Sequence, residues 1–139
     1  MSGTRRLFKY VVWAGVAANW AFGIWAIFGD PDTLLARFRL GEQQSHIWLY
    51  NYSVLLMILS LFYLPAATNP FRYRANAWLL IVGRLVPAST FLFGVITGFM
   101  PKGFLTLMAG DSTFGLVELV LLVKLLRQGP EPQDLKVEE

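Results

Sequence analysis

Four long apolar stretches constrain the fold of this chain more than any other feature. Residues 10–28 and 47–71 carry no charge, and two further stretches, near 76–98 and 104–126, are interrupted only by isolated charges. A helix rises 1.5 Å per residue, so about 20 apolar residues cross the hydrocarbon core of a bilayer. Each stretch is therefore long enough to form one membrane-spanning helix.

The sequence predicts an all-α, four-helix transmembrane bundle in one domain, residues 1–127. Only 15% of the residues are charged, against about 25% in an average soluble domain. Pro65 and Asn69-Pro70 predict that the second helix stops near residue 66. The expected spans are about 8–28, 47–66, 76–98 and 104–126, followed by a flexible cytoplasmic tail at 128–139.

The distribution of basic residues predicts that both termini are cytoplasmic. Lys and Arg collect at cytoplasmic span ends, and seven of them flank the N-terminus, the connection between spans two and three, and the end of span four. The opposite side carries three. The seven are Arg5, Arg6, Lys9, Arg72, Arg74, Lys124 and Arg127, and the three are Arg37, Arg39 and Lys102.

The loop between the first two spans predicts a short amphipathic helix over about 31–40, lying on the outer surface. Asp30 is suited to the N-cap and Pro31 to the first helical position, while Gly41 is suited to ending the helix. Its apolar face would contain Leu34, Leu35 and Phe38. Such a helix either shields the end of the bundle or offers a docking face to a partner or a gate to a pocket.

Arg84 and Glu118 are charges inside the third and fourth apolar stretches. A charge at mid-bilayer costs at least about 2.5 kcal/mol, so it is retained when it is paired, hydrated or functional. At 1.5 Å per residue both lie roughly 13 Å from the cytoplasmic ends of their helices, which predicts contact between adjacent antiparallel spans. The pair is either a static ion pair that fixes helix register or a site for an anionic headgroup, a quinone carbonyl or a proton.

Asp111 admits two interpretations. Within a helix that begins at Phe104 it is a third charge inside a span, on the same face as Gly115 and Glu118. The run Gly110-Asp111-Ser112-Thr113 also suits an N-cap, in which case residues 103–110 would form an irregular or re-entrant entry.

Small residues indicate where helices pack. Gly15, Asn19 and Gly23 recur at every fourth position of the first span. This stripe predicts close helix approach, with the Asn19 amide bonded across the interface. Gly115 is expected to serve the same purpose on the fourth span.

Several classes of function are disfavoured by composition. The chain has no cysteine and one histidine, His46, so it lacks a thiol pair, a pair of axial haem ligands and a metal-ligand set. No catalytic residue is assigned and no metal is expected. The basic residues flank apolar stretches and form no continuous patch, which argues against binding to nucleic acid.

The pattern as a whole resembles the DoxX-like group of small bacterial four-span membrane proteins. The resemblance covers residues 7–127 and rests on the four spans and four local features: Gly29-Asp30-Pro31-Asp32, the turn 69–74, Arg84 and Asp111. It implies a multi-pass protein of the bacterial inner membrane, and a group that includes accessory and quinone-linked membrane subunits.

Function is expected to follow from this architecture. The first hypothesis is a non-catalytic accessory subunit of a larger membrane complex, respiratory or otherwise redox, with membrane lipid and other integral membrane subunits as partners and no intrinsic cofactor. The alternative is a small quinone- or lipid-binding membrane protein that uses Arg84 and Glu118. An intact bundle that loses a bound quinone or lipid on Arg84→Met would favour the alternative.

Overall fold

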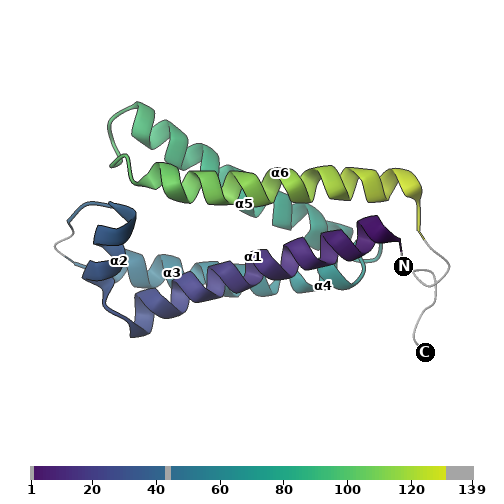
Figure 1. Ribbon diagram of the computed structural model, residues 1–139, viewed down its shortest axis with the longest axis horizontal. Coiled ribbons are helices and arrows are strands. Elements are labelled where there is room, and N and C mark those ends of the chain that lie inside the picture. Colours follow the sequence, from purple (N-terminus) through teal and green to yellow (C-terminus); the bar gives the residue numbers. More distant parts are fainter. Residues whose placement is uncertain (1, 43–44, 131–139) are drawn as a thin grey trace.

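A computed structural model describes residues 2–42 and 45–130, and these residues form helices and connections without a strand. The predicted all-α architecture is confirmed. Six helices are present (Figure 1): α1 Gly3–Phe28, α2 Pro31–Phe38, α3 Ile47–Leu61, α4 Leu64–Thr68, α5 Arg74–Ile96 and α6 Phe104–Gln128. Residues 131–139, most of the predicted tail, lie outside the described part of the chain.

Four helical segments in the described residues are long and apolar enough to cross a membrane: α1, α3 together with α4, α5 and α6. The protein is therefore a helical multi-pass membrane protein.

Two of the predicted span boundaries differ from those of the structure. Helix α1 begins at Gly3 because the Ser2 hydroxyl caps it, accepting from the Arg5 backbone N–H at 3.3 Å. Helix α5 ends at Ile96, before Gly98 turns the chain with φ of 75°.

The second span is broken earlier than predicted and continues further. Helix α3 ends at Leu61, and α4 then carries the chain from Leu64 to Thr68. Pro65 explains the break, because its ring clashes with the carbonyl one turn earlier and it has no N–H to donate. At this break, the Asn76 side-chain amide donates to the Phe62 carbonyl at 2.7 Å.

The short helix of the first loop is α2, which starts as the sequence predicts. The Asp30 side chain accepts from the Asp32 backbone N–H, and Pro31 is the first helical residue. The predicted end at residue 40, with Gly41 as terminator, is wrong. The helix stops at Phe38 because Arg39 adopts the left-handed conformation, φ 55° and ψ 42°.

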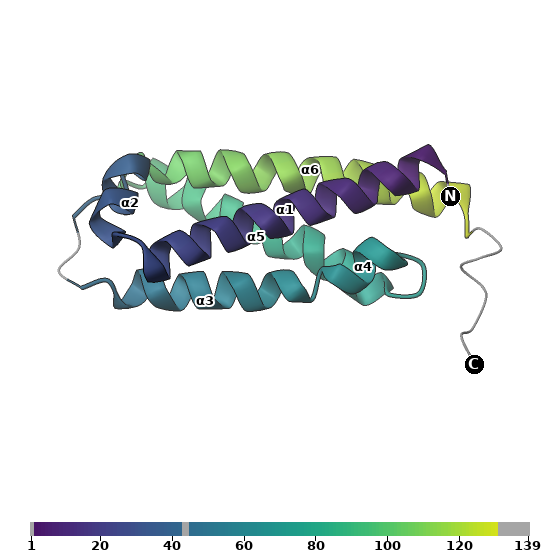
Figure 2. The ribbon, with the colours of Figure 1, turned by 60° about the horizontal axis from the view of Figure 1, so that its bottom comes forward.

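The start of α1 and the end of α6 lie at one end of the bundle, which we call the terminal end, and α2 covers the opposite end, which we call the loop end (Figure 1). Figure 2 shows α1 crossing the bundle diagonally, close to α6 at the terminal end and beside α3 at the loop end. Helices α5 and α6 pack against each other. The diagonal course of α1 separates it from α6 toward the loop end.

Two apolar cores form as a result. The terminal core joins α1, α4, α5 and α6, and the loop core joins α1, α2 and α3. The terminal core contains Phe8, Val12, Val16, Tyr63, Ala66, Ala67, Ala77, Leu80, Ile81, Leu121, Leu122 and Leu125. The loop core contains Ala26, Leu34, Leu35, Leu40 and Leu49. A polar cluster lies between them.

Candidate functional site

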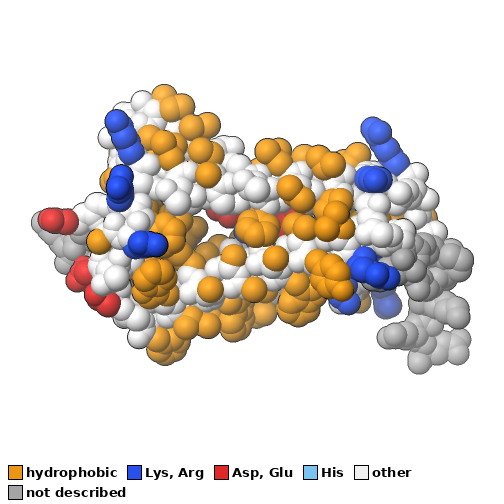
Figure 3. Space-filling model, in the orientation of Figure 1, with side chains coloured by type: hydrophobic (Ala, Val, Ile, Leu, Met, Phe, Trp, Pro, Cys, Tyr) orange, Lys and Arg blue, Asp and Glu red, His pale blue; other side chains and the backbone are white. Residues whose placement is uncertain are grey.

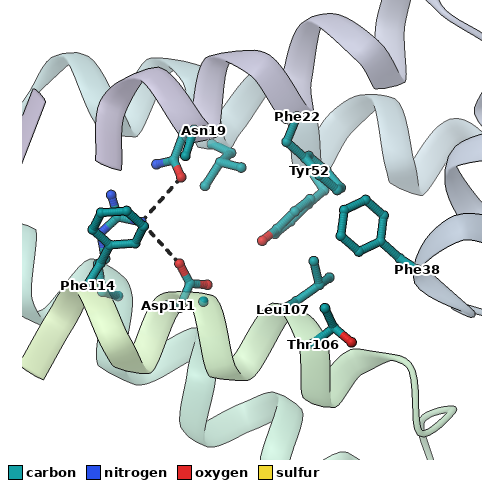
Figure 4. A pocket seen from close by; sticks show the side chains of 12 residues that line it. Asn19, Phe22, Phe38, Tyr52, Thr106, Leu107, Asp111 and Phe114 are labelled. Atoms are coloured by element: carbon teal, nitrogen blue, oxygen red, sulfur yellow. Dashed lines mark hydrogen bonds and ion pairs between the residues drawn. The ribbon is translucent and has the colours of Figure 1, made fainter. Parts of the chain in front are cut away.

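Arg84 of α5 is the centre of the polar cluster (Figure 4). Its Nη1 donates to Asn19 Oδ1 of α1 at 3.3 Å and to Asp111 Oδ1 of α6 at 3.2 Å. Its Nε lies 3.5 Å from Glu118 Oε2, within ion-pair distance. Arg84 and Glu118, predicted to be level, thus meet, and one guanidinium is shared between two carboxylates.

The members of the cluster differ in burial. The side chains of Glu118 and Arg84 are 0% and 3% exposed, whereas that of Asp111 is 15% exposed. Asp111 lies within α6, which begins at Phe104, so the alternative in which Asp111 caps the helix is wrong. The helix starts earlier because residues 104–110 continue the regular hydrogen-bonded turns, with Gly103 as the N-cap.

Two glycines create the space for the Arg84 side chain. A Cβ at Gly15 would lie 2.3 Å from Arg84 Nη2, and a Cβ at Gly115 would lie 3.1 Å from Arg84 Cβ and 2.8 Å from Leu85 Cδ2. Real Cβ atoms do not approach that closely, so both positions favour glycine. The absence of a side chain at Gly15 therefore makes room for the Arg84 guanidinium. It does not bring the backbone of a neighbouring helix close, as the small-residue stripe predicts.

The rest of the predicted stripe has a different neighbour. A Cβ at Gly23 would lie 2.5 Å from Met57 Sδ and 3.4 Å from the Ser53 carbonyl oxygen, both on α3. Gly23 therefore packs α1 against α3. Asn19, between the two glycines, bonds to Arg84 across the bundle as its amide was expected to bond.

Aromatic rings flank the guanidinium. The Arg84 Cζ atom lies 5.0 Å from the centre of the Phe114 ring and 5.9 Å from that of Tyr63. Cation–π attraction at these distances adds about 1–2 kcal/mol per ring when the cation is desolvated.

A pocket of about 170 Å³ lies between this cluster and the loop end. It is lined from five helices by Ala18, Asn19, Phe22, Phe38, Tyr52, Leu56, Arg84, Thr106, Leu107, Gly110, Asp111 and Phe114. Figure 3 shows a hollow between α1 and α6 with the red of Asp and Glu side chains along its edge. The hollow opens on the side of the bundle, which faces lipid when the four spans cross a bilayer.

The exposed rim of the pocket is made of small side chains. Ala18 of α1 and Gly110 of α6 are both exposed lining residues, and a Cβ at Gly110 would meet nothing within 4 Å. The rim therefore leaves the pocket open at its mouth.

A second cavity, of about 200 Å³, continues toward the loop end. It shares Phe22, Tyr52 and Leu107 with the first pocket and is otherwise lined by Leu40, Trp48, Phe91, Met100 and Phe104. The two cavities together form a space that is polar at the Arg84 end and apolar at the other.

His46 lies apart from this site. Its Nε2 is 2.9 Å from Asp32 Oδ1 of α2, and its ring contacts that of Tyr50 at 6.2 Å between centroids. Of the three polar residues Tyr50, Asn51 and Tyr52 near the start of α3, Tyr50 is the one whose ring contacts His46. Tyr52 alone lines the pocket with Asp111.

Residue spacing could have identified two aromatic pocket residues, Phe22 and Phe114, that were not predicted. Phe22 follows Asn19 by three residues and Phe114 follows Asp111 by three, so each aromatic ring lies on the same helix face as a polar member of the cluster. Neither ring is among the residues that the sequence predicts for the site. In the described residues, no group of three His, Cys, Asp or Glu is placed to hold a metal ion.

Comparison with protein-family models, with curated proteins and with solved structures finds no match for this chain. The resemblance to the DoxX-like group therefore stays a prediction.

Proposed function

We propose that this protein binds a small lipid-soluble molecule that enters its pocket sideways from the bilayer. One observation carries the proposal: the buried charged cluster forms part of the wall of a pocket with an open side. Charges that served only to fix helix register would gain nothing from an adjoining cavity.

The incomplete bonding of the cluster supports this function. Arg84 Nε and Nη2 and both oxygens of Glu118 have no hydrogen-bond partner among the described residues. A buried pair that only stabilised the bundle is expected to adopt a bidentate geometry that satisfies these atoms. Arg84 is part of the pocket wall, so its guanidinium is placed to donate to another molecule.

The pocket favours a ligand with an apolar body and one polar group. The walls are mostly aromatic and aliphatic, while the Tyr52 hydroxyl points toward the space in front of Asp111 (Figure 4). The shape and the mostly apolar lining of the pocket admit a quinone or a lipid, the two ligands suggested by the sequence. The adjoining apolar cavity would receive the tail.

The accessory-subunit hypothesis remains a second prediction. Exposed side chains such as Val86, Phe93 and Ile96 of α5 form an apolar outer surface, which suits lipid and a partner helix equally. Purification in mild detergent followed by identification of co-migrating subunits tests it.

We also propose that the terminal end is cytoplasmic and that the protein resides in a bacterial inner membrane. The support for the orientation is the excess of Lys and Arg at the terminal end, and the proposal of a bacterial inner membrane rests on the resemblance to the DoxX-like group. The chain has no native cysteine, so Glu42→Cys and Arg72→Cys can be labelled without background. An impermeant thiol reagent should label position 42 and not position 72 in intact cells; the reverse result would invert the topology.

The binding function is tested by closing the mouth of the pocket. Gly110→Leu adds a side chain at the rim, where a Cβ has free space, so the fold should be retained. Protein purified in mild detergent from native membranes should release a lipophilic molecule, identified by mass spectrometry of the solvent extract, and Gly110→Leu should lack it.

Ala109→Leu is the matched control, because Ala109 is the exposed neighbour of Gly110 and does not line the pocket. It should retain the same molecule as the unmodified protein. An identical set of extracted molecules in all three proteins would contradict the proposal.

A further inference from the structure

We propose that the ligand of this pocket is a small hydrophobic organic cation, such as an ammonium group attached to an aromatic or alkyl body. The inference rests on the proposed binding function and specifies its ligand class. Two independent features support it: the charge balance of the cluster and the arrangement of aromatic rings around the pocket.

The cluster has one negative charge in excess. Arg84 supplies one positive charge, and Asp111 and Glu118 supply two negative charges at ion-pair distance from it. No other Lys, Arg or His lines the pocket. An uncompensated charge in an apolar interior is costly, and a positively charged ligand removes the excess.

The excess charge is not satisfied within the protein. Glu118 is 0% exposed, and neither of its carboxylate oxygens has a hydrogen-bond partner among the described residues. Asp111 bonds to Arg84 through Oδ1 alone, and its side chain retains 15% exposure as part of the pocket wall. Asp111 is therefore the carboxylate that a ligand reaches, while Glu118 contributes charge from behind Arg84.

Aromatic rings provide the second feature. Phe22 contacts Phe38 at 5.7 Å between centroids with 65° between planes, and Tyr52 at 6.1 Å with 88°. Phe22 therefore stands nearly edge-on to two rings that line the same pocket. All three rings line the same pocket, and the faces of aromatic rings attract quaternary ammonium groups.

The same two features disfavour an anionic or a neutral ligand. An anionic headgroup, considered from the sequence because of Arg84, would add a second uncompensated negative charge. A neutral molecule would leave the excess as it is. A proton bound by either carboxyl group would also remove it, so the experiment must separate a cation-selective site from one that is already neutral.

The test compares three probes of similar shape and different charge. Phenyltrimethylammonium is the cation, tert-butylbenzene its neutral isostere and benzenesulfonate the anion. A cavity of about 150 Å³ accepts one benzene ring, so the first pocket, of about 170 Å³, is large enough for the ring of each probe, and its open side leaves room for the substituent. Each is titrated calorimetrically into detergent-solubilised protein and, for correction, into protein-free micelles.

We expect the cation to bind at least about 10-fold more tightly than the neutral isostere, from desolvated cation–π and charge attraction, and the anion not to bind. Asp111→Asn should reduce the preference for the cation to near unity, and Asp32→Asn, a carboxylate of α2 outside the first pocket, should leave it unchanged. Phe22→Leu should reduce the preference while keeping all charges, which supplies a second variant if Asp111→Asn does not fold.

The outcomes separate this inference from the proposed function. Equal binding of cation and neutral isostere, both abolished by Gly110→Leu, would overturn the cation inference and leave the binding function standing. Absence of binding by all three probes, with Gly110→Leu also identical to the unmodified protein in extracted molecules, would overturn both.

Discussion

The two ends of the bundle are made from the same four spans but differ in how those spans meet. At the terminal end, α1 lies against α6, and side chains such as Phe8, Leu80 and Leu122 fill the interior. At the loop end, α1 lies beside α3 and is separated from α6, and two cavities are present there. The Arg84 cluster lies at the change from one arrangement to the other. The terminal end is therefore the closely packed half of the bundle, and the loop end contains the pocket that we propose binds a ligand.

Removing the cation of the cluster should have the largest effect. Arg84→Met leaves Asp111 and Glu118 buried without a counter-charge, and we expect a loss of about 3–5 kcal/mol in the free energy of unfolding. Glu118→Gln should cost under about 1 kcal/mol, because Arg84 keeps Asp111 as its partner. Chemical unfolding in detergent measures both.

If Arg84 were paired with Glu118 only, the two changes would cost similar free energies of unfolding. Equal measured losses would show that Asp111 does not share the guanidinium. In the double mutant, additive losses would mean that Arg84 and Glu118 do not interact.

Shortening an apolar side chain should distinguish the two ends. Leu122 is 1% exposed in the terminal core, so Leu122→Ala leaves a new cavity and should cost about 2–4 kcal/mol. Leu107 lies between the two existing cavities, so Leu107→Ala should cost about 1–2 kcal/mol. Thermal unfolding of the two variants side by side measures the difference, and a larger loss at Leu107 would reverse the comparison.

Two glycine substitutions should act in opposite directions. Gly15→Ala forces the Arg84 guanidinium aside and should destabilise by about 1–3 kcal/mol. Gly110→Ala meets open space in the interior of α6 and should stabilise by about 0.5–1 kcal/mol, because alanine favours the helix. Midpoints of unfolding report both signs, and stabilisation by Gly15→Ala would show that the guanidinium does not lie against that position.

The smallest effect is expected at the cap of α2, at the exposed edge of the loop end. Hydrogen bonding from the Thr33 side chain, opposed by desolvation and aided by the backbone N–H groups of Asp32 and Thr33, lowers the pKa of Asp30 below its ordinary value of 3.8. The cap therefore contributes stability above about pH 3.8, and this contribution is lost as the pH falls through the lower folded-state pKa.

Thr33→Val should raise the pKa of Asp30 toward 3.8 by removing the first of these hydrogen bonds. Carboxyl ¹³C chemical shifts followed over an acid titration measure the change. An unchanged Asp30 titration would show that the Thr33 hydroxyl does not set the pKa of Asp30.

Much of the fold follows from local patterns in the sequence. The length of the apolar stretches specifies four spans because a helix has a fixed rise per residue. The Asp30-Pro31 start of α2 follows from capping chemistry, which involves neighbouring residues only. The sequence predicts that the second span stops near residue 66, but α3 ends at Leu61. The difference arises because the clash of a proline ring falls on the preceding turn.

The sequence also predicts that Arg84 and Glu118 lie at the same depth along the bundle. Counting the rise along two antiparallel helices places Arg84 opposite Glu118, and the two side chains are indeed within ion-pair distance. Periodicity placed Asp111, Gly115 and Glu118 on one face of α6.

Only the tertiary structure decides what those faces meet. The diagonal course of α1 brings Gly15 and Asn19 to Arg84 but carries Gly23 to Met57, and no helical period encodes that crossing. The same crossing opens the mouth beside Gly110. A pocket depends on the rotation and separation of whole helices, which are set by contacts between residues far apart in the chain, so the sequence supplied the charges and the bundle geometry placed them beside an opening.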